Sequence, residues 1–369
     1  MSRVDCKNIW KIYNGNVIGV KDLTFTCNDK EFLAILGPSG GGKSSTLRML
    51  AGLEEISKGE VLFDGKKVNQ LGPAKRNIAL AFESYALYYR LSVYENIAFP
   101  LRAKGISNKD VDKGVKDIAE ALNLASILKK RPAELAGGYQ QRVSLARALI
   151  RKPNLTLLDE PLSHMDQRIR AEIRAHIRSI HEELGNTTIY VTHDQAEAIS
   201  LCDRILILNY GELQQIGTVD DIYNNPVNKF VAFFVGEPGM NFIKCTVESP
   251  DNVSLQMSEG KKIFGFSGAV NPKYVGSEIT MGIRPQQIGV VEHGGKKSIM
   301  SGLVKIVEFQ GDNDILTVEL DDINKTRIKV VIPAGGKRFK REETCWMDFQ
   351  PEYIHLFDEA EKAIIERRS

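Results

Sequence analysis

Short apolar runs that alternate with helix-like stretches dominate the N-terminal part of the chain. Several runs are almost continuously apolar, which is typical of strands buried on both faces of a parallel sheet. These predicted strands lie at 32–36, 77–83, 155–158 and 204–208. Other stretches repeat apolar residues three or four positions apart and predict helices. The predicted helices lie at 45–50, 107–131, 140–151, 166–184 and 219–225. This alternation indicates an α/β fold.

The pattern changes after the Gly236-Glu237-Pro238-Gly239 segment. Helical spacing fades there, and short strands separated by turn residues continue to about Phe357. Such a pattern predicts a small β-barrel or β-sandwich. We therefore expect two domains, 1–236 and 237–369, a division that suits a chain of 369 residues.

A glycine-rich segment follows the apolar run at 32–36. It reads Gly37-Pro38-Ser39-Gly40-Gly41-Gly42-Lys43-Ser44 and precedes the helix predicted from Ser45, so it matches G-x-x-x-x-G-K-[ST] between a strand and a helix. Glycines let backbone N–H groups converge on an anion, and the helix adds the positive end of its dipole. We expect Lys43 to reach the outer phosphates of a nucleotide and the Ser44 hydroxyl to ligate Mg²⁺.

Acidic residues and a histidine follow two other predicted strands. Asp159 and Glu160 end the run at 155–158, and His193 ends a strand predicted at 187–192. Ligands of open α/β sheets bind where parallel strands end. We therefore expect Asp159 to hold Mg²⁺, Glu160 to polarise a water, and His193 to contact phosphate.

For several aromatic and basic residues, the sequence allows either a binding role or a purely structural one. Tyr13 precedes a turn between two β-like runs, where its ring can stack on adenine or simply be half-buried. The tyrosines and phenylalanine at 85–99 suit either a binding surface or ordinary loop packing. The arginine stripe formed by Arg170, Arg174 and Arg178 is typical of a solvated helix face.

Composition limits which binding partners and which cellular compartment we expect for this protein. Lys and Arg number 49 against 47 Asp and Glu, so no global charge favours nucleic acid or anionic lipid. Five scattered cysteines lack metal-site spacing and predict reduced thiols of a cytosolic protein. No signal-peptide core and no run near about 18 apolar residues is present, so membrane association is expected through a partner.

Read together, these motifs resemble the ATPase subunit of an ATP-binding-cassette (ABC) transporter. The matching segments are Lys43-Ser44 for the first nucleotide motif, Asp159-Glu160 for the second, Leu135-Ala136-Gly137-Gly138 for the signature loop, Ser163-His164-Met165-Asp166 for the D-loop and His193 for the switch histidine. The resemblance implies a P-loop NTPase cassette, with a RecA-like core and a helical signature subdomain, that uses ATP and Mg²⁺. It implies that Tyr13 stacks on adenine, that Ser45, Asp166 and the signature loop contact nucleotide, and that Lys43, Glu160 and His193 are catalytic.

Shorter strings resemble sugar-importer ATPases of the maltose and glycerol-phosphate type. They lie at 225–232, 240–243, 282–286 and 355–358. This resemblance implies a C-terminal regulatory domain of the OB-like kind and a sugar, polyol or glycerol-phosphate as the solute. The implied partners are a second ATPase subunit, two transmembrane permease subunits and, indirectly, an extracytoplasmic solute-binding protein, with no nucleic acid. The implied location is peripheral, on the cytoplasmic face of the inner membrane.

Some positions depart from the family pattern. Glu83 replaces the usual Gln, and we expect one of its oxygens to ligate Mg²⁺. Ala136 and Tyr139 replace the Ser and Gln of the signature, which removes a phosphate donor worth about 1.5–3 kcal/mol. In the D-loop, His164-Met165 replace Asn-Leu, and Gly41 stands where sugar importers often have Cys.

These departures favour an asymmetric pair of ATPase subunits over a homodimer. In a face-to-face dimer, the signature loop of one chain serves the ATP of the other, so the altered loop would complete only one of two sites. The alternatives are the ATPase of a polyamine or iron importer, and a nucleotide-binding regulatory subunit with little turnover. A DNA-repair or translation cassette would carry a long coiled-coil insertion or a second cassette, and the sequence has neither.

Overall fold

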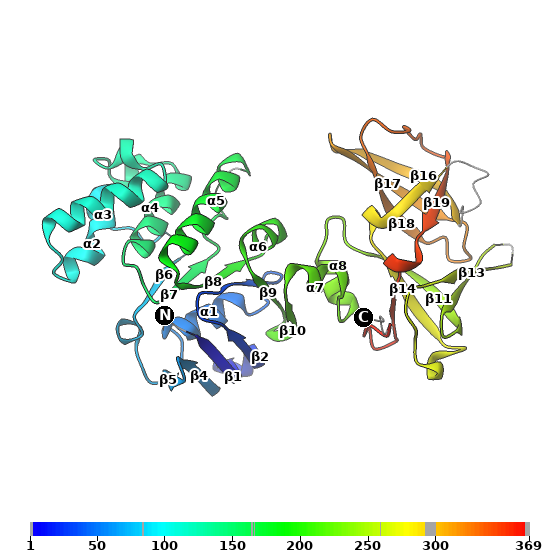
Figure 1. Ribbon diagram of the computed structural model, residues 1–369, viewed down its shortest axis with the longest axis horizontal. Coiled ribbons are helices and arrows are strands. Elements are labelled where there is room, and N and C mark those ends of the chain that lie inside the picture. Colours follow the sequence, from blue (N-terminus) through cyan, green and yellow to red (C-terminus); the bar gives the residue numbers. More distant parts are fainter. Residues whose placement is uncertain are drawn as a thin grey trace. The chain divides into compact units, whose positions relative to one another are not determined.

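The computed structural model describes residues 3–82, 85–163, 165, 167–258, 260–291 and 300–365. The chain divides into two compact units, Met1–Val219 and Asp220–Ser369 (Figure 1). This division lies before helix α8 (Lys229–Phe234), whereas the domain boundary that we expect from the sequence lies after it, at 236/237. That boundary stays a prediction.

A six-stranded sheet forms the centre of the first unit, with the order β10-β9-β3-β8-β7-β6. The strands are β3 (Phe32–Leu36), β6 (Ile78–Ala81), β7 (Leu155–Asp159), β8 (Thr187–Thr192), β9 (Arg204–Asn209) and β10 (Glu212–Gly217). All neighbours pair in parallel except β9 and β10. Every residue of β3, β7 and β8 is buried, as expected for strands covered on both faces.

An antiparallel sheet, β2-β1-β4-β5, forms a second layer of this unit. Its strands are β1 (Val4–Tyr13), β2 (Val17–Cys27), β4 (Lys58–Phe63) and β5 (Lys66–Lys67). One hydrophobic cluster contains Val20 from this sheet, Leu47 from helix α1 (Lys43–Ala51) and Val191 from β8. The helix after the glycine-rich segment is thus fixed by apolar packing against both sheets.

Helices α2 (Val93–Ala103), α3 (Asn108–Ala121) and α4 (Gly137–Leu149) gather at one end of the first unit (Figure 1). The prediction of one helix over 107–131 is wrong, because α3 ends at Ala121 and Asn123 has a left-handed φ of 54°. The first unit also contains α5 (Gln167–Leu184) and α6 (Gln195–Leu201). Within the described ranges, no helix has both the length and the apolar character needed to span a membrane.

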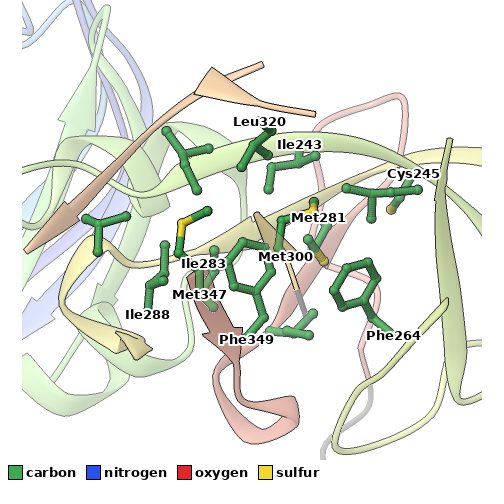
Figure 2. Close-up of a cluster of buried hydrophobic side chains, with 14 of the residues drawn as sticks. Ile243, Cys245, Phe264, Met281, Ile283, Ile288, Met300, Leu320, Met347 and Phe349 are labelled. Atoms are coloured by element: carbon green, nitrogen blue, oxygen red, sulfur yellow. The ribbon is translucent and has the colours of Figure 1, made fainter. Parts of the chain in front are cut away.

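The second unit contains two five-stranded antiparallel sheets. One, in the order β13-β12-β11-β14-β20, contains β11 (Asn241–Ser249), β12 (Asn252–Gln256), β13 (Lys261–Gly265), β14 (Glu278–Ile283) and β20 (His355–Phe357). The other, in the order β15-β19-β16-β17-β18, contains β15 (Ile288–Val291), β16 (Met300–Phe309), β17 (Asn313–Leu320), β18 (Arg327–Pro333) and β19 (Thr344–Phe349). Side chains from both sheets form one core, in which Figure 2 shows Met281, Met300, Met347 and Phe349. The expected β-rich C-terminal domain is confirmed.

A buried arginine attaches two short helices to the β-sheets of the second unit. The Arg284 guanidinium donates to the carbonyl of Tyr223, in α7 (Val219–Asn224), and to the carbonyl of Val235, which follows α8. Its carbon lies 3.7 Å from the centroid of the Tyr223 ring. Since the helix ends would otherwise leave buried carbonyls unpaired, Arg284 is part of the core of this unit.

Candidate nucleotide-binding and catalytic site

The glycine-rich segment joins β3 to α1 in a conformation that requires glycine. Gly42, the N-cap of α1, has a φ of 93°, and Gly40 has a φ of 77°. A Cβ on Gly42 would lie 2.5 Å from the Gly19 carbonyl oxygen. No side chain caps α1, so its first N–H groups are left for an anion.

Strand β9 and the turn that follows it lie close against this loop. The Gly211 N–H, in the turn between β9 and β10, donates to the Gly41 carbonyl at 3.0 Å. A Cβ on Gly37 would lie 2.3 Å from the Leu208 carbonyl oxygen. Close backbone contacts of this kind explain why the loop is glycine-rich even where φ is ordinary.

Two oxygen ligands suitable for magnesium meet beside the loop. The Ser44 hydroxyl donates to Asp159 Oδ1 at 3.0 Å, although the two residues are 115 positions apart. Hydroxyl and carboxylate oxygens fit Mg²⁺, which takes few protein ligands and keeps waters or phosphate oxygens. Among the residues that the structure describes, no group of three or more His, Cys, Asp or Glu could hold a metal.

The Glu160 carboxylate lies between a lysine and a histidine. Its Oε2 is 2.9 Å from His193 Nδ1, and its Oε1 is 3.8 Å from Lys43 Nζ. Lys43 is only 5% exposed and also donates to the Pro38 carbonyl at 3.0 Å. The carboxyl ends of β3, β7 and β8 therefore bring together Lys43, Glu160 and His193, the three catalytic residues expected from the sequence.

Glu160 has a backbone conformation that is unusual for its residue type. Its φ is 45°, in the left-handed region. Its N–H donates to the Val191 carbonyl at 2.9 Å, and its own carbonyl accepts from Gln141 Nε2 at 3.1 Å and from Ser163 Oγ at 3.0 Å. These bonds come from β8, from α4 and from the segment after β7, so several elements hold Glu160 in this conformation.

Tyr13 lies beside the first turn of α1. Its hydroxyl is 2.9 Å from Ser45 Oγ, and a Cβ on Gly19 would lie 2.7 Å from the edge of its ring. Lys11 Nζ lies 4.9 Å from the ring centroid. Tyr13 is thus half-buried next to the phosphate loop, a position that suits adenine stacking, and that role stays a prediction.

The signature segment forms the start of α4. The helix begins at Gly137, earlier than the Gln140 start predicted from the sequence, because the two glycines already adopt helical geometry. Ala136 is its N-cap and has no side-chain acceptor to offer. Tyr139 is 37% exposed, and the Arg142 guanidinium carbon lies 4.2 Å from its ring centroid.

Some expected site residues are not described by the structure. Glu83, His164 and Asp166 lie outside the described residues. The expected contacts of Glu83 with Mg²⁺ and of Asp166 with nucleotide therefore stay predictions.

Three arginines have fixed partners that could not be recognised from the sequence. Arg170 donates to the Ser163 carbonyl and to Asp194, both at 3.2 Å, and Arg178 donates to Asp203 at 2.9 Å. The prediction of a merely solvated stripe is therefore wrong for these two, because each guanidinium has fixed partners. Arg147 donates to the carbonyls of Tyr85 and Ala86, which both have positive φ. Helical spacing alone cannot show such bonds, since their acceptors are backbone carbonyls of distant segments.

Parallel strands that bring a phosphate loop and an acid pair to one edge of a sheet are the arrangement of P-loop NTPases, and the first unit has that fold. Comparison with known families agrees. The ABC transporter model matches residues 20–163, the MalK OB fold domain model matches 236–288, and the TOBE domain model matches 281–357.

Curated relatives align with almost the whole chain. The trehalose/maltose import ATP-binding protein MalK of Thermococcus litoralis is 40% identical, over 97% of this chain and 98% of the relative. The multiple sugar-binding transport ATP-binding protein MsmK of Streptococcus mutans is 40% identical, over 99% of this chain and all of the relative (100%). The oligosaccharides import ATP-binding protein MsmX of Bacillus subtilis is 40% identical, over 87% and 89%.

A solved structure resembles the first unit. It is a dimeric ATP-binding cassette in a post-hydrolysis state, bound to ADP and Pi. The structural alignment has a TM-score of 0.55 and a sequence identity of 30%, and it covers 58% of this chain and 98% of the solved chain. With relatives this similar along its length, the chain belongs to the ATP-binding subunits of ABC import systems. It is an ATPase, and the nucleotide is ATP.

Proposed function

We propose that this subunit powers the uptake of a sugar, or of a related polyol or glycerol-phosphate, through two permease subunits. The names of the three relatives support a sugar, since they refer to trehalose and maltose, to oligosaccharides and to multiple sugars. They favour this solute class over the polyamine or iron alternative. Transport of radiolabelled sugars by the assembled complex tests the solute, and uptake of a polyamine or iron instead would contradict the proposal.

The placement of Glu160 between Lys43 and His193 carries the proposed mechanism. Lys43 binds the outer phosphates, His193 contacts the transferred phosphoryl group, and Glu160 orients or accepts a proton from the attacking water. Ser44 and Asp159 would hold Mg²⁺, which supplies charge neutralisation when bound. Phosphate release by the purified chain, abolished by Lys43→Ala, tests this assignment. Turnover that survives Lys43→Ala would contradict it.

The nucleotide sites are proposed to lie between two ATPase subunits, one of them a paralogue of this chain. Support for pairing comes from the dimeric cassette among the similar structures, and support for asymmetry comes from Ala136, which offers no hydroxyl at the start of α4. Turnover should rise when the paralogue is added to the purified chain. Full turnover by the homodimer would contradict the asymmetry and leave the ATPase assignment intact.

A groove near the tyrosine cluster is the proposed contact with the permease subunits. It has a volume of about 560 Å³ and is lined by Tyr88 and Phe99, whose ring centroids lie 4.8 Å apart, and by three cations, Lys104, Arg147 and Arg151. Such a contact would keep the chain peripheral, at the cytoplasmic face of the membrane. Tyr88→Ala should reduce co-purification with the permease subunits, while Tyr210→Ala, at a residue 84% exposed in the β9–β10 turn, should not. Equal co-purification of both variants would contradict this placement.

The C-terminal part, 237–369, is proposed to be a regulatory domain that leaves the chemistry to the cassette. The matches to the MalK OB fold and TOBE domains support this role. The alternative, a nucleotide-binding regulatory subunit with little turnover, predicts ATP binding without phosphate release even in the assembled complex. Multiple turnovers by that complex would exclude the alternative.

A further inference from the structure

Arg170, near the start of α5, donates hydrogen bonds in three directions. Its Nε donates to the Met165 carbonyl at 2.9 Å, and another guanidinium nitrogen donates to the Ser163 carbonyl at 3.2 Å. The third nitrogen lies 3.2 Å from Asp194 Oδ2. The side chain is 29% exposed, so it is largely covered by its partners. A planar guanidinium makes such divergent bonds in a fixed geometry that an ammonium group cannot reproduce.

These bonds close a ring around the proposed catalytic acid. The Ser163 hydroxyl donates to the Glu160 carbonyl at 3.0 Å, and the Glu160 carboxylate contacts His193 at 2.9 Å. Asp194 follows His193 and caps α6 by accepting from the Ala196 N–H at 2.8 Å. The ring therefore runs from Glu160 through Ser163, Arg170, Asp194 and His193 back to Glu160.

Met165, which accepts a hydrogen bond from Arg170, lies next to the signature loop of the same chain. A Cβ on Gly138 would lie 3.8 Å from the Met165 side chain, which is buried. Met165 thus packs on the start of α4, while Arg170 binds the carbonyls of Ser163 and Met165. Arg170 therefore joins the segment after β7 to Asp194, which is next to His193 in the chain.

We propose that Arg170 is a positioning residue for hydrolysis, which fixes His193 relative to Glu160 by joining the segment after the acid to the residue after the histidine. The proposal rests on the proposed function of these two residues. Glu160 adopts a left-handed φ that persists only when its surroundings restrain it, and Arg170 binds Ser163, one of the residues that restrain it. Arg170 acts through Ser163 and Asp194, which its guanidinium binds directly.

Arg170→Met tests this role, because it keeps an apolar chain of similar length and removes all three bonds. Misplacement of a catalytic group by about 1 Å costs roughly 100-fold in rate, so we expect kcat to fall between about 10-fold and 100-fold. KM for ATP and the Kd of a fluorescent ATP analogue should change less than about twofold, since phosphate-loop contacts persist. Arg170→Lys should restore part of the loss, because it keeps the charge next to Asp194.

Arg178→Met is the matched control. Arg178 lies further along the same helix and makes the same kinds of bonds, to the Leu201 carbonyl and to Asp203, both at 2.9 Å. Its partners lie away from Glu160 and His193 in the sequence. We expect a similar drop in thermal midpoint for both variants but a loss of kcat only for Arg170→Met. If Arg170→Met does not fold, the comparison is made with Arg170→Lys and Arg178→Lys.

A double-mutant cycle separates the ring from simple stability. Asp194→Asn keeps the acceptor that caps α6 and weakens the bond to Arg170. If the ring acts as a unit, Arg170→Met with Asp194→Asn has the kcat of Arg170→Met alone. Equal kcat for Arg170→Met and Arg178→Met, a KM that rises in step with the loss of kcat, or additive losses in the cycle would each overturn the proposal. A wrong assignment of the catalytic residues would give a different result from a wrong role for Arg170. In that case, phosphate release would persist in the Lys43→Ala variant.

Discussion

Glu160 Oε2 and His193 Nδ1 lie 2.9 Å apart, although the residues come from the ends of two different strands. The bond exists because β7 and β8 are parallel neighbours, paired from Leu155–Thr187 to Asp159–Val191. The same pairing orients Glu160 Oε1 towards Lys43, at 3.8 Å. The contacts of Glu160 with His193 and Lys43 are therefore made within one chain.

Glu160→Gln should reduce phosphate release by at least about 100-fold, because the amide cannot accept a proton from water. Binding of ATP, measured with a fluorescent analogue, should change little, since the amide remains close to Lys43. Glu172→Gln, on the exposed face of α5, is the control and should leave turnover unchanged. Wild-type turnover in Glu160→Gln would rule out this acid as the catalytic one.

Alanine substitutions at two glycines of the phosphate loop should have unequal effects on stability. Gly40→Ala introduces strain alone, about 1 kcal/mol, because a Cβ there meets no atom within 4 Å. Gly42→Ala adds a contact of 2.5 Å with the Gly19 carbonyl and should cost about 3 kcal/mol or more. Urea denaturation without nucleotide measures both values. A smaller loss for Gly42→Ala than for Gly40→Ala would contradict the loop geometry.

Ala136→Ser should stabilise the cassette, because α4 has no side-chain N-cap acceptor. A serine there is worth about 1 kcal/mol, seen as a higher thermal midpoint. An existing serine N-cap can be removed from a neighbouring helix as the opposite test, because Ser107 caps α3 by accepting from the Asp110 N–H at 3.3 Å. Ser107→Ala should lower the midpoint by a similar amount. If Ala136→Ser leaves both midpoint and turnover unchanged, the missing hydroxyl is not a source of asymmetry.

Arg284→Met should destabilise the second unit. Burial lowers the pKa of Arg284 to about 10, and its removal leaves the carbonyls of Tyr223 and Val235 buried without these donors. At about 1–3 kcal/mol for each orphaned acceptor, we expect a loss of about 3 kcal/mol. Trp346 fluorescence in a Trp10→Phe background reports this unit. Arg327→Met, on the exposed side of β18, is the control, and an equal effect of both changes would contradict the anchoring role.

The stability of the cassette should depend on pH through Glu197. Burial raises the pKa of Glu197 above its usual value of 4.5, although hydrogen bonds from Thr192 and Tyr190 oppose the rise. The folded chain therefore holds this proton more tightly than the unfolded chain. The contribution of Glu197 to the free energy of unfolding is complete below pH 4.5. It is lost as the pH rises through the pKa of the folded state, by at most about 1.4 kcal/mol per pH unit.

The Glu197→Gln variant is the reference, because the glutamine side chain does not titrate in this pH range. The free energy of unfolding of the wild type minus that of Glu197→Gln should fall from about pH 4.5 upwards. Denaturant titrations at a series of pH values measure this difference. A difference that rises with pH would show that the hydrogen bonds outweigh burial and that the pKa is lowered instead.

Local sequence patterns were sufficient for the elements that carry the chemistry. The continuous apolar runs predicted β3 and β7, and the glycine-rich segment predicted a phosphate loop before α1, because the apolar period and the need for positive φ act within a few residues. The end of α3 was not predicted, since the apolar spacing continues past Asn123 while the backbone turns there. The roles of Arg147 and Arg170 were not predicted either, because backbone carbonyls leave no mark in the sequence.

The sequence by itself determined the class of fold, the phosphate loop and the candidate acids, because each is encoded by neighbouring residues whose conformational or chemical demands are local. Only the tertiary structure decided that Ser44 meets Asp159, that Glu160 lies between Lys43 and His193, and that Arg170 joins Ser163 to Asp194. Those distances depend on the order and register of parallel strands whose pairing is stabilised by the whole core. A pattern read along one segment cannot contain that information.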